Sequence, residues 1–198
     1  PEILENTRVF HVGSLSLTDD PSRTATYEAI NIARNSGAVI SYDPNYRAAL
    51  WSDPETAQLR MQSLIPYVDM MKISDEETSL LTPYQDPEEA IQYLLRQGVH
   101  LVAVTLGRDG ALIGNENGII KAEGFSSHAV DTTGAGDSFW GGFLASYLQE
   151  ETSPEHLTRA QMIQFGRVGN AVASLCVERR GGISAIPEME EIEERLRG

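Results

Sequence analysis

The chain alternates short segments rich in β-branched and apolar residues with longer segments of helical period. The expected strands are residues 9–13, 38–43, 69–73 and 101–106. The expected helices between them are residues 21–36, 54–65 and 87–97, and each opens with a proline at or near its first turn, where the missing N–H costs nothing. This alternation predicts an α/β fold in which helices flank a largely parallel central sheet.

The sequence changes character after residue 110. Between residues 110 and 129, short strand-like segments are interrupted by Asn and Gly, and the step Asn117-Gly118 is typical of a hairpin turn. The remaining expected helices are residues 135–149, 159–177 and 188–196. No internal repeat, linker or low-complexity run divides the sequence, so we expect residues 1–198 to form one piece.

The charge balance limits the partners of such a chain. Its 198 residues include 15 Lys and Arg against 29 Asp and Glu, a formal net charge of −14. This charge repels phosphate backbones and anionic lipids, so we expect neither a nucleic acid nor a membrane as a partner. A single cysteine, no apolar stretch near the ~20 residues of a membrane span and no secretion signal at the start predict a cytoplasmic location.

The segment DTTGAGDSF, residues 131–139, joins the end of a predicted strand to the start of a helix. Gly134, Ala135 and Gly136 allow a tight turn whose N–H groups point to one place, where the helix N-terminus adds partial positive charge. The turn therefore predicts an anion site. A carboxylate at Asp137 would repel a bound phosphate, but it is explained if it takes a proton from a hydroxyl that attacks the phosphorus.

The alternative is a glycine turn with Asp137 as an ordinary first-turn acid. The pattern D-T-x-G-A-G-D-x-F fixes many positions, and at average residue frequencies its chance occurrence in a chain of this length is on the order of 10⁻⁶. A dinucleotide-binding loop is disfavoured, because that loop follows the first strand of its unit. Position and charge together predict phosphoryl transfer.

This segment resembles the second signature of the ribokinase-like (PfkB) family of carbohydrate kinases and, within it, of the fructokinases. The resemblance extends over essentially the whole chain and implies a ribokinase-like fold with ATP and Mg²⁺ as cofactors. It implies that Asp137 is the catalytic base and that Gly134, Ala135 and Gly136 form the anion hole. The implied ligands are a nucleotide and a small-molecule sugar, with fructose as the expected substrate.

Two further regions resemble the nucleotide site of that family. The segment VTLGRDGA, residues 104–111, is similar to the strand and turn beside the nucleotide, which implies contacts from Thr105, Gly107 and Gly110. For the two glycines, the alternative is a turn that any β-connection uses. Asn170 is implied to contact the nucleotide as well, and the alternative for it is a satisfied buried amide.

The segment KISDEE, residues 72–77, occupies the place of the family's N-x-x-E motif, with Ser74 in place of the asparagine. The resemblance implies that Glu77 helps to organise Mg²⁺ through water. The alternative is a first-turn helix acid that the helix dipole stabilises.

The segment DPNYR, residues 43–47, followed by LW at 50–51, is similar to a stretch of fructokinases and of 2-keto-3-deoxygluconate kinases. Asp43, Asn45 and Arg47 alternate at the carboxyl end of a predicted strand, the edge at which open α/β sheets bind ligands. We expect them to bind the sugar, with Arg47 as a forked donor to sugar oxygens or to the γ-phosphate. The alternative is a strand-ending turn with Arg47 in a surface ion pair.

Asp131 and Thr133 precede the glycine turn. In many members of the family, the loop to which they belong and the turn near residues 179–182 enclose a monovalent cation, such as K⁺, chiefly through backbone carbonyls. The resemblance therefore implies a possible cation site there. The alternative is that Thr132 and Thr133 cap the following helix.

The family's first glycine motif and its β-lid have no counterpart in the sequence. We therefore expect residues 1–198 to be the C-terminal, nucleotide-binding and catalytic-base portion of a kinase domain, and a weak kinase or none when alone. An exposed sheet edge should favour a homo-oligomer or pairing with an N-terminal segment. The alternative functions are a 2-keto-3-deoxygluconate kinase and a non-catalytic module that binds nucleotide or sugar.

Overall fold

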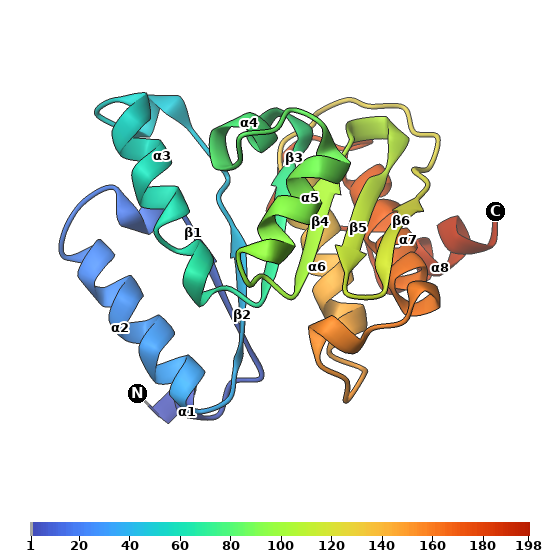
Figure 1. Cartoon of the computed structure of the whole chain (residues 1–198). Helices are drawn as coiled ribbons and strands as arrows, with labels where there is room; N and C mark the ends of the chain where they lie inside the picture. Colours follow the sequence, from blue (N-terminus) through green and yellow to red (C-terminus); the bar gives the residue numbers. More distant parts are fainter. Residues whose placement is uncertain (1) are drawn as a thin grey trace. The chain divides into compact units, whose positions relative to one another are not determined.

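The computed structural model describes residues 2–198, and Figure 1 shows their path. The α-helices are α1 (Glu2–Glu5), α2 (Ser22–Asn35), α3 (Pro54–Gln62), α4 (Thr78–Leu81), α5 (Pro87–Arg96), α6 (Ala135–Tyr147), α7 (Arg159–Cys176) and α8 (Met189–Arg197). The strands are β1 (Val9–Gly13), β2 (Val39–Asp43), β3 (Met70–Ser74), β4 (Leu101–Thr105), β5 (Ala111–Asn115) and β6 (Gly118–Ala122). All the predicted strands and helices are present, with ends shifted by a few residues.

The strands are hydrogen-bonded in the order β1-β2-β3-β4-β5-β6. Strands β1 and β2 pair in parallel, as do β2 and β3, whereas β5 and β6 form an antiparallel hairpin. Helical crossovers connect the parallel strands, as such pairing requires. The predicted α/β fold with a largely parallel sheet is confirmed. At the end of the order, β1 has a strand partner on one side only within residues 2–198.

The chain divides into two compact units, Pro1–Ala103 and Val104–Gly198. The border lies inside β4, a strand that is mostly buried. Pro, Gly and Ser do not accumulate at this border, which is why the composition of the sequence does not mark it. The expectation that residues 1–198 form one portion of a kinase domain stays a prediction.

In the first unit, side-chain caps set the starts of two helices, α3 and α5. Asp53 accepts a hydrogen bond from the amide of Thr56 at 2.8 Å, and Asp86 accepts one from the amide of Glu89 at 3.0 Å. A proline follows each cap at the first helical position, where it leaves no further amide to satisfy. These caps explain why α3 and α5 begin where the sequence predicts.

In the second unit, α6 and α7 pack against each other, and α7 also contacts β5, β6 and α8. Phe143 is central to this packing, because its ring stacks on Trp140 with centroids 5.0 Å apart and meets Phe165 edge-on at 5.7 Å. A β-carbon on Gly142 would lie 3.1 Å from the α-carbon of Gly169, so the two helices approach closely. This packing fixes α6, whose first three residues are the last three of the DTTGAGD segment.

The β5–β6 hairpin differs by one residue from the prediction. Asn115 pairs with Gly118, so the two-residue loop is Glu116 and Asn117 rather than the step Asn117-Gly118. Gly118 has a φ of 102° and opens β6. The side chain of Asn115 accepts the amide of Asn117 at 2.9 Å and donates to the carbonyl oxygen of Leu157 at 2.8 Å, so it ties the loop to the segment before α7.

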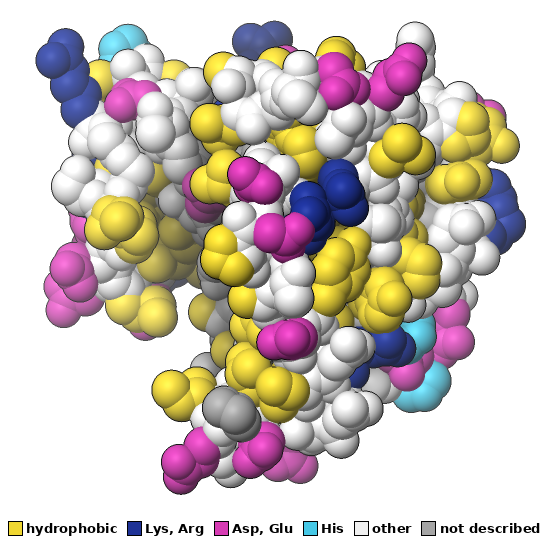
Figure 2. All heavy atoms as spheres, turned by 90° about the vertical axis from the view of Figure 1, so that its left-hand side faces the viewer, with side chains coloured by type: hydrophobic (Ala, Val, Ile, Leu, Met, Phe, Trp, Pro, Cys, Tyr) yellow, Lys and Arg dark blue, Asp and Glu magenta, His cyan; other side chains and the backbone are white. Residues whose placement is uncertain are grey.

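The surface agrees with a chain of formal net charge −14. Figure 2 shows one face, on which acidic side chains are scattered among hydrophobic and other polar ones rather than gathered in one patch. Among residues 2–198, none of the helices combines the length and the apolar character that crossing a lipid bilayer requires.

A substitution at Gly110 tests the packing of the hairpin. A β-carbon there would lie 2.1 Å from the carbonyl oxygen of Ala122, and the φ of Gly110 is 93°. We expect Gly110→Ala to lower the free energy of unfolding by about 2–5 kcal/mol, since the left-handed backbone costs roughly 1–2 kcal/mol and overpacking about 1–3 kcal/mol. Urea unfolding curves measure the change.

Gly98→Ala is the matched control. Gly98 has a similar φ of 99°, but nothing lies within 4 Å of its β-carbon position. This variant should lose only the backbone cost of about 1–2 kcal/mol. If both variants lowered the free energy of unfolding equally, the close approach at Gly110 would not contribute to the stability of the hairpin.

Candidate functional site

The loop before α6 ends at Gly134, the N-cap of the helix, with a left-handed φ of 77°. A β-carbon at this position would lie 3.2 Å from the α-carbon of Gly182, so glycine suits both the conformation and the space. The amide of Ala135 donates to the carbonyl oxygen of Thr132 at 3.2 Å. Within residues 2–198, the amides of Gly134 and Gly136 donate to no acceptor.

This arrangement reduces the number of amides that are available to the predicted anion hole. Of the three amides that the sequence suggests, that of Ala135 is already engaged inside the turn, whereas those of Gly134 and Gly136 remain open to an anion. The helix dipole adds partial positive charge at the same place. The residues therefore fit a phosphate group, although its binding stays a prediction.

Asp137 lies in the first turn of α6 with an exposed side chain. The next residues, Ser138, Phe139 and Trp140, are buried, so the helix directs them into the core and leaves Asp137 at the surface. A base that takes a proton from a substrate must be exposed in this way. The catalytic role of Asp137 stays a prediction, but its orientation suits that role.

The carboxylate of Asp131 fastens the loop to the turn after α7. Its Oδ1 accepts the amide of Thr133 at 2.9 Å, and its Oδ2 accepts the amide of Gly181 at 3.0 Å. The hydrogen bond from Gly181, then those from Thr133 and the charge of Arg180, lower the pKa of Asp131 to about 2. The amide of Asp131 itself donates to the carbonyl oxygen of Val177 at 3.1 Å.

The structure thus brings together the two segments that the resemblance assigns to a monovalent cation. The carbonyl oxygen of Thr133, one of the candidate ligands, accepts a weak hydrogen bond from the buried thiol of Cys176 at 3.9 Å. The helix-capping alternative for the threonines is not seen, because the N-cap is Gly134 and no side chain caps it. Cation binding by this loop stays a prediction.

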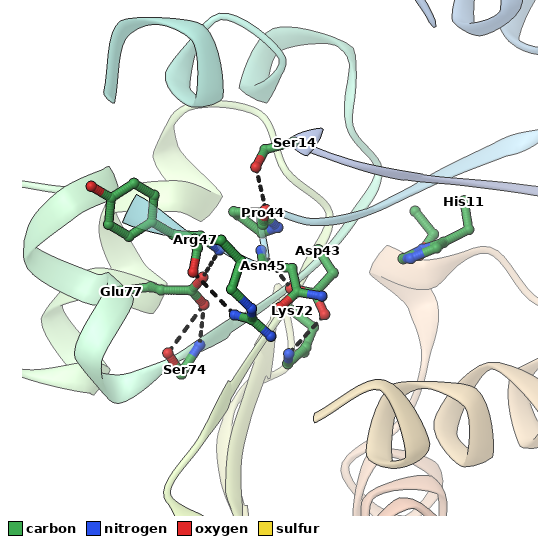
Figure 3. A network of polar contacts seen from close by, with 11 residues as sticks. His11, Ser14, Asp43, Pro44, Asn45, Arg47, Lys72, Ser74 and Glu77 are labelled. Carbon is green, nitrogen blue, oxygen red and sulfur yellow. Dashed lines mark hydrogen bonds and ion pairs between the residues drawn. The ribbon is translucent and has the colours of Figure 1, made fainter. Parts of the chain in front are cut away.

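The segment at residues 43–47 follows β2 in the first unit, and Figure 3 shows its contacts. Asp43 is 3% exposed; its Oδ2 accepts the ammonium of Lys72 at 2.7 Å, and its Oδ1 accepts the amide of Asn45 at 3.1 Å. Asn45 has a φ of 47°, a left-handed value that no other non-glycine residue among 2–198 adopts. Asn tolerates this conformation better than most residues.

Arg47 is exposed, and its Nη1 donates to the carbonyl oxygen of Tyr46 at 3.0 Å. No ion pair includes Arg47 within residues 2–198, so the surface ion pair is not what holds it. Asp43, Asn45 and Arg47 therefore lie together at the carboxyl end of β2, as predicted. Their contact with a sugar stays a prediction.

Glu77 is 8% exposed and accepts hydrogen bonds on both carboxylate oxygens. Its Oε1 accepts the amide of Tyr46 at 2.8 Å, and its Oε2 accepts the amide and hydroxyl of Ser74 at 2.9 and 3.1 Å. The Ser74 contacts form a capping box, which matches the alternative of a first-turn acid. A role toward Mg²⁺ through water stays a prediction.

All four candidate nucleotide residues lie in the second unit, and Thr105 is the last residue of the border strand β4. Gly107 has a φ of 57° with open space at its β-carbon position, whereas Gly110 closely approaches the end of β6. The Nδ2 of Asn170 donates to the carbonyl oxygens of Ala122 and Glu123 at 2.9 and 3.0 Å. Gly110 and Asn170 thus have structural roles at the end of β6, and nucleotide contacts from these four residues stay a prediction.

Lys72 is the site residue that the sequence analysis left without a role. It stands in the buried strand segment MMKIS, where an ammonium group needs a partner. The signal that points to it is the charge inside an apolar strand, beside a neighbouring strand that ends in Asp43. Among residues 2–198, no group of three or more His, Cys, Asp or Glu side chains is arranged to hold a metal ion.

These features define a class of α/β proteins in which ligands bind at the carboxyl ends of parallel strands and anions bind at a helix N-terminus. Residues 2–189 match the pfkB family carbohydrate kinase, and the chain belongs to this family.

Two curated relatives and one solved structure illustrate the match. The chain is 35% identical over 199 residues to probable fructokinase-4 of Arabidopsis thaliana, covering 100% of the chain and 60% of that protein. It is 36% identical over 181 residues to putative fructokinase-8 of Arabidopsis thaliana, covering 91% of the chain and 85% of that protein. The chain spans about 60% of the length of the first of these relatives.

The solved structure is a fructokinase from Vibrio cholerae O395 in a fructose, ADP and calcium ion bound form. The match has a TM-score of 0.87 at 32% identity and covers 95% of the chain and 60% of the solved chain. The similarity therefore extends over nearly all of the present fold.

The titration of Asp131 tests the link between the loop and the turn after α7. Its pKa is lowered from 3.8 to about 2, so its charged form stabilises the folded state. That contribution is complete above pH 3.8 and is lost as the pH falls through about 2. The ¹³C chemical shift of this carboxyl group should show a midpoint near 2.

Asp131→Asn should remove this part of the pH dependence. Between pH 4 and pH 2, the free energy of unfolding of the wild type should fall more steeply than that of the variant. Only the wild type has a carboxyl group at residue 131, and its unfolded state binds a proton at a higher pH than its folded state. A midpoint near 3.8 together with equal slopes would contradict the hydrogen bond from Gly181.

Proposed function

We propose that the chain belongs to an ATP-dependent sugar kinase that transfers the γ-phosphoryl group to a primary hydroxyl of fructose. The observation that carries this proposal is the turn before α6, where two open amides lie beside an exposed carboxylate. An anion site and a base so close together suit phosphoryl transfer better than phosphate storage, because the carboxylate weakens simple anion binding. Membership of the pfkB family supports the same reaction class.

In this proposal, the amides of Gly134 and Gly136 stabilise the charge that develops on the transferred group. The carboxylate of Asp137 takes the proton from the attacking hydroxyl, and Arg47 and Asn45 orient the sugar. Mg²⁺ bound with the nucleotide would supply positive charge that neutralises the phosphates. Glu77 would order the waters around that ion, and the loop at Asp131 and Thr133 would hold K⁺.

Fructose is favoured over 2-keto-3-deoxygluconate by the cations near the loop at residues 43–47. A sugar acid carries a carboxylate that needs a cationic partner. Lys72 is already paired with Asp43 at 2.7 Å, which leaves Arg47 as the exposed cation of this loop. A neutral sugar makes no such demand. The solved relative from Vibrio cholerae O395 holds fructose and ADP, which is consistent with this choice.

We further expect the cytoplasm as the compartment and a homo-oligomer, or pairing with an N-terminal segment, as the assembly. Within residues 2–198, β1 pairs with β2 on one side only, and its other edge is one that either arrangement would cover.

Asp137→Asn tests the base. The substitution keeps the size of the side chain but removes its basicity, so turnover of the full natural protein should fall by about 10²–10⁴-fold. Affinity for ATP should be kept or should rise, since the amides of the turn are unchanged and a negative charge that repels the phosphates is removed. A coupled ADP assay and calorimetry measure the two effects. Unchanged turnover would refute the assignment of Asp137.

A substrate panel tests the sugar. Fructose should be phosphorylated with a higher kcat/KM than 2-keto-3-deoxygluconate, because one exposed cation gives a sugar acid little support. The reverse order would favour the sugar-acid kinase. Binding of both nucleotide and sugar without turnover in the full natural protein would instead favour a non-catalytic module.

A further inference from the structure

The sequence contains only two lysines, Lys72 and Lys121, and they lie in opposite environments. Lys121 is exposed on β6 and pairs with Glu123 at the surface. Lys72 is 5% exposed in β3, between the buried side chains of Met71 and Ile73. A buried ammonium group is costly unless it is paired and hydrogen-bonded. The position of Lys72 therefore calls for an explanation.

Its partner is the carboxylate of Asp43, which is buried as well and lies 2.7 Å away. A buried ion pair is a poor source of stability, because well-packed apolar residues commonly do as well. The ion pair does, however, fix the orientation of the Asp43 carboxylate. With Oδ2 held by Lys72, the carboxylate presents Oδ1 to the amide of Asn45 at 3.1 Å.

The amide of Asn45 belongs to the left-handed residue of this loop, with a φ of 47°. Asn tolerates that conformation better than most residues with a β-carbon, but it is uncommon even for Asn, so the hydrogen bonds of the loop help to select it. Beyond Asn45, the amide of Tyr46 donates to Glu77 at 2.8 Å. Two buried carboxylates thus hold consecutive amides, and Figure 3 shows both contacts close to Arg47.

We infer that Lys72 is a positioning residue for sugar binding: it orients the carboxylate of Asp43 so that Asn45 keeps its left-handed conformation and Arg47 its direction. This inference rests on the proposed function, because it assumes that the loop at residues 43–47 binds the sugar. Lys72 itself is buried and hydrogen-bonded to Asp43, so it acts through the loop rather than on the substrate.

Lys72→Met removes the charge but keeps most of the side-chain length, and Lys121→Met is the matched control at the only other lysine. In Lys72→Met, amide hydrogen exchange of Asn45 should become at least about tenfold faster. Fructose affinity should fall by about tenfold or more, since misplaced binding groups lose their alignment. ATP affinity should stay within about twofold. Lys121→Met should change none of the three.

The exchange rate and the affinities separate two kinds of failure. Unchanged exchange of Asn45 in folded Lys72→Met overturns the positioning role. Faster exchange with unchanged fructose affinity overturns it too, because the loop would then not set sugar binding. If the wild-type full natural protein binds ATP but no fructose, the proposed substrate fails, whereas the exchange measurement still decides whether Lys72 orders the loop.

An unpaired Asp43 in Lys72→Met could prevent folding, since an uncompensated buried charge is strongly destabilising. The double variant Lys72→Met with Asp43→Asn then takes its place, because it removes both charges. We expect at least about tenfold faster exchange of Asn45, with fructose affinity lowered and ATP affinity kept. Wild-type exchange and fructose affinity in the folded double variant would overturn the inference.

Discussion

Hydrogen bonds from backbone amides to carboxylates fix the loops on which the candidate sites depend. Asp43 and Glu77 hold the amides of Asn45 and Tyr46 in the first unit, and Asp131 holds those of Thr133 and Gly181 in the second. Each carboxylate replaces water as the acceptor for a loop amide. A charge-assisted bond of this kind is stronger than one between neutral groups, so it can fix irregular backbone.

This use of carboxylates relates to the charge of the whole chain. Side chains alone give a formal net charge of −14, which disfavours the approach of a phosphate group. The anion site that we propose in the turn before α6 would use amides rather than lysines, because an amide attracts an anion without adding a side chain that the surrounding acids would pair. Three of the acids, Asp43, Glu77 and Asp131, hold loop amides.

The sequence predicts the fold well and the candidate site in part. Periodicity and proline starts locate the strands and long helices of the first unit, because these signals are local. The role of Lys72 is not local, since it depends on β2 and β3 lying side by side. The engagement of Ala135 in its own turn also needs backbone coordinates, and so does the contact of Asn170 with the end of β6.

The burial of Lys72 has a practical consequence for chemistry on the protein. Lys121 is left as the one lysine whose amine meets solvent, and it lies on the β5–β6 hairpin. Reagents that acylate amines at mild pH should therefore react with Lys121 in preference to Lys72 and place a label on this hairpin. Such a label gives a fluorophore or a surface tether a defined place in the second unit.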